Sequence, residues 1–114
     1  MCIRDRSKGH ALVIPKYPAR DIFSLPAAHL SALMAEAQRT AAALREAFAP
    51  EGMFLYQLNG VAAGQSVFHI HMHVVPRYEG VPLRSHEEGM EDNAVLAEQA
   101  EQVRAALERL ASSA

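Results

Sequence analysis

The chain has 114 residues, 50% of them hydrophobic and 21% charged, which suits one globular domain and argues against extended disorder. Its formal net charge of −2 gives no basic excess for a nucleic-acid polymer or an anionic membrane, so neither is an expected partner. The single cysteine, Cys2, excludes an internal disulfide, and the lack of a long apolar run or an apolar leader predicts a cytoplasmic protein.

The first predicted element follows an irregular start. Residues 1–6 carry charge without periodicity, and we predict that they are a non-native leader to a partial domain over residues 7–114. Residues 10–16 contain a short apolar run stopped by Pro15, which is typical of a strand buried on both faces. Residues 17–24 then predict a polar connector.

A long amphipathic helix is predicted next. Ser24 suits the N-cap position, and Pro26 is tolerated in the first turn. Apolar residues then recur on one helical face as far as Phe48, and the many alanines favour a helix. The Pro-Glu-Gly sequence at residues 50–52 is expected to end it.

Two strands follow this helix in the prediction. They lie at residues 53–58 and 67–75, with a turn at Asn59 and Gly60 after the first and Pro76 closing the second. Strands joined by a short loop favour antiparallel pairing.

The end of the chain predicts a second helix. Residues 77–90 look irregular, and an apolar stripe from Asn93 onwards indicates an amphipathic helix. The order strand, helix, strand, strand, helix predicts an α+β fold with the helices packed against the sheet.

Three histidines alternate within the predicted strand at residues 67–75. They are His69, His71 and His73. Because successive side chains of a strand point to opposite faces, these imidazoles share one face. The other face, which we expect to pack under the helices, carries Ile70, Met72 and Val74.

This histidine row has three interpretations: decoration of an exposed face, a metal site, or covalent and acid–base chemistry. Side chains two apart on a strand lie roughly 6.7 Å apart, so one zinc reaches two of the three at best, and we expect no metal or other cofactor. The preceding loop supports the third interpretation. Gly64 permits close backbone approach, and Gln65 and Ser66 supply an amide and a hydroxyl suited to phosphate.

Together these motifs resemble the histidine triad (HIT) family of nucleotide hydrolases and transferases. The resemblance is carried by HIHMHVV at residues 69–75, GQS at 64–66 and GHALVIPK at 9–16, and it covers roughly residues 7–77. It implies an antiparallel sheet with a long helix and a C-terminal helix packed on it. Since the family has a longer segment before GHALVIPK, it also implies that early strands are missing here.

The resemblance implies roles for four histidines. His71 is the nucleophile, whose Nε2 attacks an α-phosphorus while its other nitrogen donates to the backbone carbonyl of His69. His73 contacts the phosphate and helps to protonate the leaving group. His10 is the fourth histidine and bonds into the network behind the triad.

The resemblance also implies roles for neutral side chains. Gln65 binds near the leaving-group atom, Ser66 binds a phosphate oxygen, and Asn59 lies on the leaving-group side. Turn chemistry alone explains Asn59 next to Gly60 equally well.

We therefore predict a phosphoramidase-type hydrolase that cleaves a nucleoside phosphoramidate or related nucleotide through a nucleotidyl-histidine intermediate. The uridylyltransferase branch of the family has glutamine as its third triad residue, so His73 favours hydrolysis. A dinucleoside polyphosphate hydrolase and a non-catalytic nucleotide-binding protein of the same fold are the alternatives. The resemblance implies a homodimer, and the missing strands predict weak or no activity for these 114 residues alone, in contrast to an active full-length parent.

Overall fold

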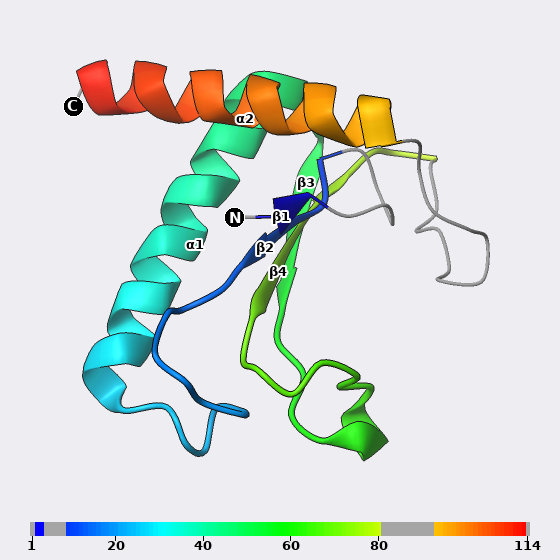
Figure 1. The fold of residues 1–114 in the computed structure, drawn as a ribbon. Coiled ribbons are helices and arrows are strands. Elements are labelled where there is room, and N and C mark those ends of the chain that lie inside the picture. Colours follow the sequence, from blue (N-terminus) through cyan, green and yellow to red (C-terminus); the bar gives the residue numbers. More distant parts are fainter. Residues whose placement is uncertain (1, 4–8, 81–92, 114) are drawn as a thin grey trace.

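The computed structural model describes residues 2–3, 9–80 and 93–113, which form a sheet with two helices (Figure 1). In chain order the elements are β1 (Cys2–Ile3), β2 (Ala11–Val13), α1 (Ala27–Phe48), β3 (Gly52–Tyr56), the 3-10 helix η1 (Val61–Ala63), β4 (Met72–Arg77) and α2 (Asn93–Ser113). The strand order is β1-β2-β4-β3, and every neighbouring pair is antiparallel. The predicted α+β fold is confirmed.

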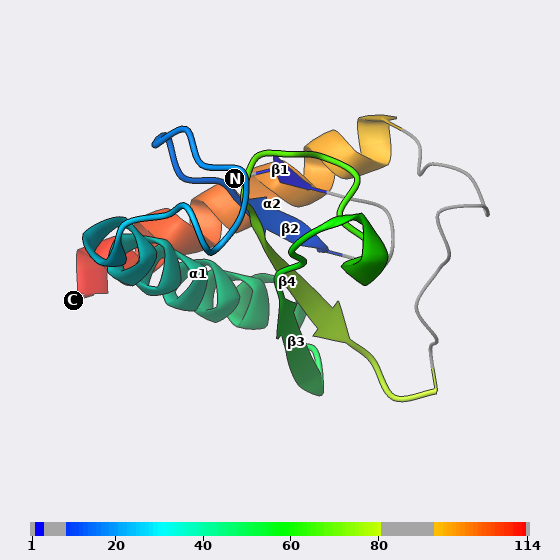
Figure 2. The same ribbon diagram turned by 90° about the horizontal axis from the view of Figure 1, so that it is seen from below.

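β4 carries the site because it is paired on both sides. It lies between β2 and β3, as the two ribbon views show (Figures 1 and 2). His73 has Leu12 of β2 opposite it on one side and Tyr56 of β3 on the other. Its backbone is therefore fixed from both sides.

One face of the sheet packs against α1 and forms the core. The buried residues from the sheet side and from α1 include Ala11, Val13, Ile70, Val74, Leu33, Ala37 and Leu44. Met72 is half-buried against the same cluster. The expectation that Ile70, Met72 and Val74 pack under the helices is confirmed, so the neighbouring His73 faces away from α1.

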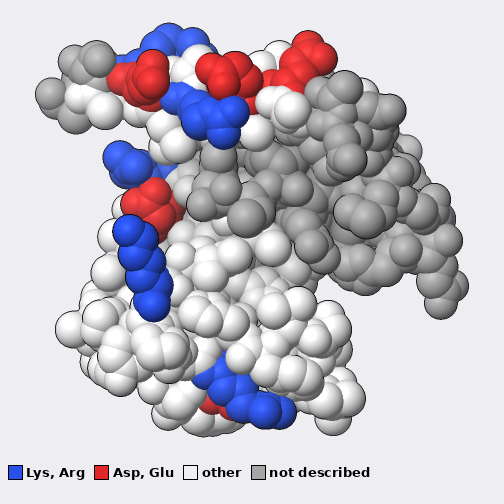
Figure 3. Space-filling view, viewed as in Figure 1, with Lys and Arg blue, Asp and Glu red and all other residues white. Residues whose placement is uncertain are grey.

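α2 crosses the C-terminal end of α1 (Figure 1). Val103 and Ala106 are fully buried there, and the Arg109 guanidinium forms an ion pair with Glu46 of α1. Acidic and basic side chains alternate along α2, whereas the lower part of the same view has fewer charged side chains, among them one basic group with an acidic patch beside it (Figure 3). No helix in the described ranges is both long enough and apolar enough to cross a bilayer.

The histidine-bearing strand begins later than predicted, at Met72. Residues 67–69 form a bend, and the Ile70 N–H donates to the carbonyl of Ala19 at 2.9 Å instead of to a strand. The reason is the length of β2: it ends at Val13, opposite Met72, so no partner strand extends alongside the earlier residues.

Pro76 does not close this strand as predicted. It lies inside β4, opposite Met53 of β3. Proline has no N–H to donate to a ladder, but β2 pairs only with Met72–Val74 and needs no donor from Pro76.

The helix α1 begins at Ala27, and the predicted N-cap role of Ser24 is wrong. Pro26 occupies the N-cap and makes no side-chain capping bond. The Ser24 hydroxyl instead bonds the Asp21 carboxylate at 3.2 Å, and that carboxylate also accepts the N–H of Phe23 at 3.1 Å. A local turn therefore uses the side chain that was expected to cap the helix.

Two further boundaries differ from the sequence prediction. β3 ends at Tyr56, and Asn59 and Gly60 belong to a longer loop that contains η1 rather than to a tight turn. Cys2 and Ile3 pair with β2, so these two residues of the predicted leader belong to the sheet. The non-native origin of residues 1–6 stays a prediction, and most of the stretch predicted to be irregular after Gly80 lies outside the described residues.

Candidate active site

His71 has its ring orientation fixed by the backbone. Its Nδ1 lies 2.8 Å from the carbonyl oxygen of His69. A carbonyl only accepts, so Nδ1 carries the proton, and the lone pair of the neutral ring is on Nε2. In the described part of the chain no hydrogen bond to this Nε2 is seen. The ring is half-buried and presents a nucleophilic nitrogen.

His73 is the centre of a group of four rings. Its Nδ1 lies 3.0 Å from Nε2 of His10, and both residues are buried. The Tyr56 ring stacks on it at 4.1 Å with an interplanar angle of 7°, and the His71 ring lies 4.9 Å away, centroid to centroid. If His10 donates in the shared bond, neutral His73 carries its own proton on Nε2. When the ring gains a second proton, it can give the Nε2 proton to a leaving group and return to the neutral form.

His69 does not share a strand face with the other two histidines. Its Nε2 lies 2.7 Å from the carbonyl oxygen of Pro15, so its ring is bonded into the connector after β2. The three-in-a-row geometry expected from the sequence is therefore wrong, because His69 and His71 precede β4 and only His73 lies in it. The structure gives His69 a backbone contribution, its carbonyl, to the alignment of His71.

Gln65 is buried and its amide holds three chain segments together. Its oxygen accepts the Gly60 N–H at 2.7 Å. Its nitrogen donates to the carbonyls of Arg20 at 2.7 Å and Val67 at 3.1 Å. Both amide hydrogens and the oxygen are thus used inside the loop region, which fixes the segment that leads into the histidines.

Asn59 links the same loop to the connector. Its Oδ1 accepts the Ile22 N–H at 2.8 Å and a bond from the Gln57 amide at 2.7 Å. Ser66 is exposed, and Gly64 adopts a left-handed backbone with φ of 102° that favours glycine. The structure thus brings His10, His71 and His73 into one cluster, while Asn59, Gln65 and His69 brace the loops around it.

Sequence reasoning missed Tyr56, whose ring forms one wall of the site. Its only sequence signal was its place in an aromatic strand, since the stack depends on Tyr56 being opposite His73 in the β3–β4 register. The sequence also did not predict the contact between the His69 ring and the Pro15 carbonyl, because such contacts depend on how the loops fold.

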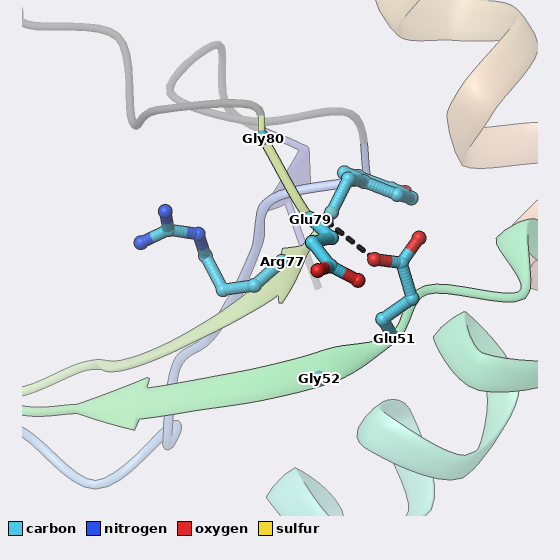
Figure 4. A pocket seen from close by; sticks show the side chains of 6 residues that line it. Glu51, Gly52, Arg77, Glu79 and Gly80 are labelled. Atoms are coloured by element: carbon cyan, nitrogen blue, oxygen red, sulfur yellow. Dashed lines mark hydrogen bonds between the residues drawn. The ribbon is translucent and has the colours of Figure 1, made fainter.

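A cavity lies at the opposite end of the β3–β4 ladder. It has a volume of about 420 Å³ and is lined by Glu51, Gly52, Arg77, Tyr78, Glu79 and Gly80. In Figure 4 the Arg77 side chain points away from the two glutamates, and the Glu79 N–H donates to the Glu51 carboxylate at 2.6 Å. Burial raises the pKa of the Tyr78 phenol. None of the described residues that line this cavity is a histidine, and the candidate active site is the histidine cluster at the other end.

Across residues 2–3, 9–80 and 93–113, no group of three or more His, Cys, Asp or Glu side chains is arranged to hold an ion. The ring nitrogens of His10, His71 and His73 that have assigned contacts are bonded to one another or to backbone carbonyls.

Comparison with known proteins gives a consistent family. The sequence profile of the HIT domain matches residues 2–80. The protein named Protein hit, from Bacillus subtilis, is 40% identical over 72 residues, which are 63% of this chain and 50% of that protein. Adenylylsulfatase HINT3 of Arabidopsis thaliana is 34% identical over 82 residues, covering 69% of this chain and 42% of that protein.

A solved structure shows the same fold. The Zn-bound histidine triad family protein from Mycobacterium smegmatis aligns with a TM-score of 0.84 and 38% sequence identity, covering 98% of this chain and 78% of that chain. The bound zinc is a property of the Mycobacterium smegmatis protein. The chain spans about half the length of the curated relatives it matches.

Proposed function

The chain belongs to the HIT domain family, and from this premise we propose that it is a nucleotide hydrolase that cleaves a nucleoside phosphoramidate or related nucleotide at the α-phosphorus. The observation that carries the proposal is the 2.8 Å bond between His71 Nδ1 and the His69 carbonyl, which directs the lone pair to Nε2. A likeness to a protein named adenylylsulfatase supports nucleotide chemistry of this type.

The first step forms a bond between Nε2 of His71 and phosphorus. The bond from phosphorus to the leaving nitrogen breaks, and its electron pair departs with that nitrogen. His73 enters this step as the imidazolium, gives the nitrogen its Nε2 proton and becomes neutral. The His71 ring is a cation in the resulting adduct, so its Nδ1–H bonds the His69 carbonyl more strongly than the neutral ring does.

The second step releases the product. Water attacks phosphorus, the bond from phosphorus to His71 breaks, and the lone pair returns to Nε2. The proton lost by the water restores His73, and a nucleoside monophosphate leaves. Each histidine ends as it began, so one chain turns over repeatedly without a cofactor.

Ser66 and Gly64 are the proposed phosphate-binding elements, since Ser66 is exposed and Gly64 has no side chain to obstruct a backbone donor. Contact of Gln65 or Asn59 with the leaving group requires exchange of a loop bond, because both amides are already bonded to neighbouring segments. The proposed role of both amides is to fix the conformation of the loops on the leaving-group side.

A homodimer through α1 and β3 is also proposed. Both elements have exposed apolar side chains, including Met34 and Phe54, each 44% exposed. Beside them is a groove of about 320 Å³, which is lined by Gln38, Ala41, Ala42, Arg45 and Met53. Sedimentation equilibrium measures the association, and a concentration-independent monomer would remove this part of the proposal.

Because the chain spans about half of its curated relatives, the activity proposed is that of the complete protein. We propose that the 114 residues alone have weak activity or none. We also place the complete protein in the cytoplasm.

The decisive experiment traps the adduct in the complete protein. A slowly hydrolysed nucleoside phosphoramidate is mixed with the protein, quenched, and the labelled peptide is identified by mass spectrometry. We expect nucleoside monophosphate on His71, and loss of turnover by at least about 10⁴-fold in His71→Ala with nucleotide binding retained. An adduct on another residue would refute the assigned nucleophile.

The substrate choice separates the alternatives. Faster cleavage of a dinucleoside polyphosphate than of the phosphoramidate would favour the second hydrolase class. Binding without turnover of either compound would identify a non-catalytic nucleotide-binding protein.

A further inference from the structure

The C-terminal helix reaches the histidine cluster through one buried side chain. Gln99 of α2 is 8% exposed, and its Oε1 accepts the N–H of Gly9 at 3.0 Å. The two residues are 90 positions apart in the sequence. The HIT profile ends at residue 80, so this contact comes from a helix outside the matched domain.

Gly9 has little freedom to satisfy its N–H in another way. It is buried and has φ of 83°, a left-handed conformation that favours glycine. A Cβ placed there would lie 2.7 Å from the Phe48 ring and 3.3 Å from Pro76. A buried N–H held this tightly needs a protein acceptor, and Gln99 supplies it.

The next residue along the chain is His10, which supports His73. The His10 side chain is completely buried, and its Nε2 lies 3.0 Å from His73 Nδ1. The bond at Gly9 fixes the backbone from which this imidazole extends. A continuous path therefore runs from Gln99 through Gly9 and His10 to His73.

We propose that Gln99 is a positioning residue for the proposed hydrolase, which fixes the Gly9 backbone so that His10 keeps His73 in position to protonate the leaving group. The inference rests on the proposed function and adds to it a part of the chain beyond the HIT domain. It assigns Gln99 to one step, departure of the leaving group, and not to nucleotide binding.

The kinetic test uses two substrates that differ in their need for a proton. One is a nucleoside phosphoramidate with an alkylamine leaving group, and the other is the p-nitrophenyl ester of the same nucleoside monophosphate, whose phenolate leaves without protonation. In the complete protein we expect Gln99→Met to lower kcat on the phosphoramidate by about 10- to 100-fold and on the ester by less than about threefold, with KM little changed.

Two variants serve as controls. Gln102→Met makes the same change at an exposed position of α2 and should leave both substrates unaffected. Gln99→Glu keeps an acceptor oxygen for the Gly9 N–H and should restore most of the phosphoramidate rate. Equal losses on both substrates in Gln99→Met would indicate a merely structural role and overturn the proposal.

A measurement without substrate separates this inference from the function itself. Nitrogen-15 NMR of the imidazole rings reports the tautomers and hydrogen bonds of His10 and His73. We expect both signals to shift in Gln99→Met and not in Gln102→Met, whether or not the protein turns over. Unchanged ring signals would overturn the positioning role, whereas shifted signals in a protein that cleaves neither substrate would refute only the proposed hydrolase.

Discussion

The two ends of the β3–β4 ladder differ in how their side chains are held. At one end Tyr56 is opposite His73, and at the other Gly52 is opposite Arg77, about 13 Å away along the strands. His73 is 7% exposed and touches three rings. The far end has a cavity of about 420 Å³, where the Glu79 N–H donates to the Glu51 carboxylate and the Glu51 N–H donates to the Arg77 carbonyl.

This contrast shows that the end with a cavity is not the end at which ring nitrogens are hydrogen-bonded. The far cavity has room for a ligand, and the described residues that line it include two glutamates, an arginine and a tyrosine but no histidine. At the histidine end the ring nitrogens are held by their neighbours: Nδ1 of His71 by the His69 carbonyl, and Nδ1 of His73 by Nε2 of His10. The candidate active site is therefore distinguished from the far cavity by its hydrogen bonds to ring nitrogens and not by its volume.

The largest expected effect is in stability, and it contrasts two glycines near the Arg77 end of the ladder: Gly9, which lies against Phe48 and Pro76, and Gly52. Gly9→Ala places a Cβ against the Phe48 ring and strains a left-handed backbone, so we expect a loss of about 2–4 kcal/mol in the free energy of unfolding. Gly52→Ala at the far end meets only the Arg77 Cβ, at 4.0 Å, and should change it by about 0.5 kcal/mol or less. Urea denaturation measures both, and equal losses would contradict the contrast.

A smaller effect is expected from the ring stacked on His73. Tyr56→Leu removes the stack, and we expect kcat on the phosphoramidate to fall by about tenfold, since aromatic pairs contribute about 0.5–1.5 kcal/mol. Phe23→Leu is the control, because it replaces an aromatic ring by leucine at a side chain that is 87% exposed. Similar losses in the two variants would show that the stack has no special role.

The smallest effect is expected at the far end and concerns pH. Burial raises the pKa of Tyr78 above its ordinary value of 10.0, so the folded protein holds this proton more tightly than the unfolded chain. Its contribution to stability is complete below pH 10.0 and is lost as the pH rises through the folded-state pKa.

Tyr78→Phe should therefore lose less stability than the parent above about pH 10, with turnover near neutral pH unchanged. Urea midpoints measured at neutral and at alkaline pH test this expectation. A fall in turnover would show that the far cavity communicates with the histidines and would remove the distinction between the two ends.

Local patterns predicted the helices and the helix-facing side of β4. The apolar intervals of α1 and the alternation of Ile70, Met72 and Val74 depend only on the geometry of the element that contains them. The start of β4 was misjudged because it depends on where β2 stops, and β2 is a different part of the chain.

The parts of the site that sequence could not provide are contacts across elements. The stack of Tyr56 on His73 depends on strand register, and the bond from Gly9 to Gln99 depends on where α2 docks. The sequence predicted that the Gln65 amide binds substrate. In the structure this amide bonds three loop segments, and the residues next to it in the sequence do not indicate those contacts.

The acceptor that orients His71 is a main-chain oxygen, and this has a consequence for how the protein tolerates change. His69→Ala would detach an imidazole from Pro15 but would leave that oxygen in the chain. Alanine scanning therefore underestimates position 69. Its proposed contribution comes from the backbone carbonyl, which only a change in backbone conformation would move away from His71.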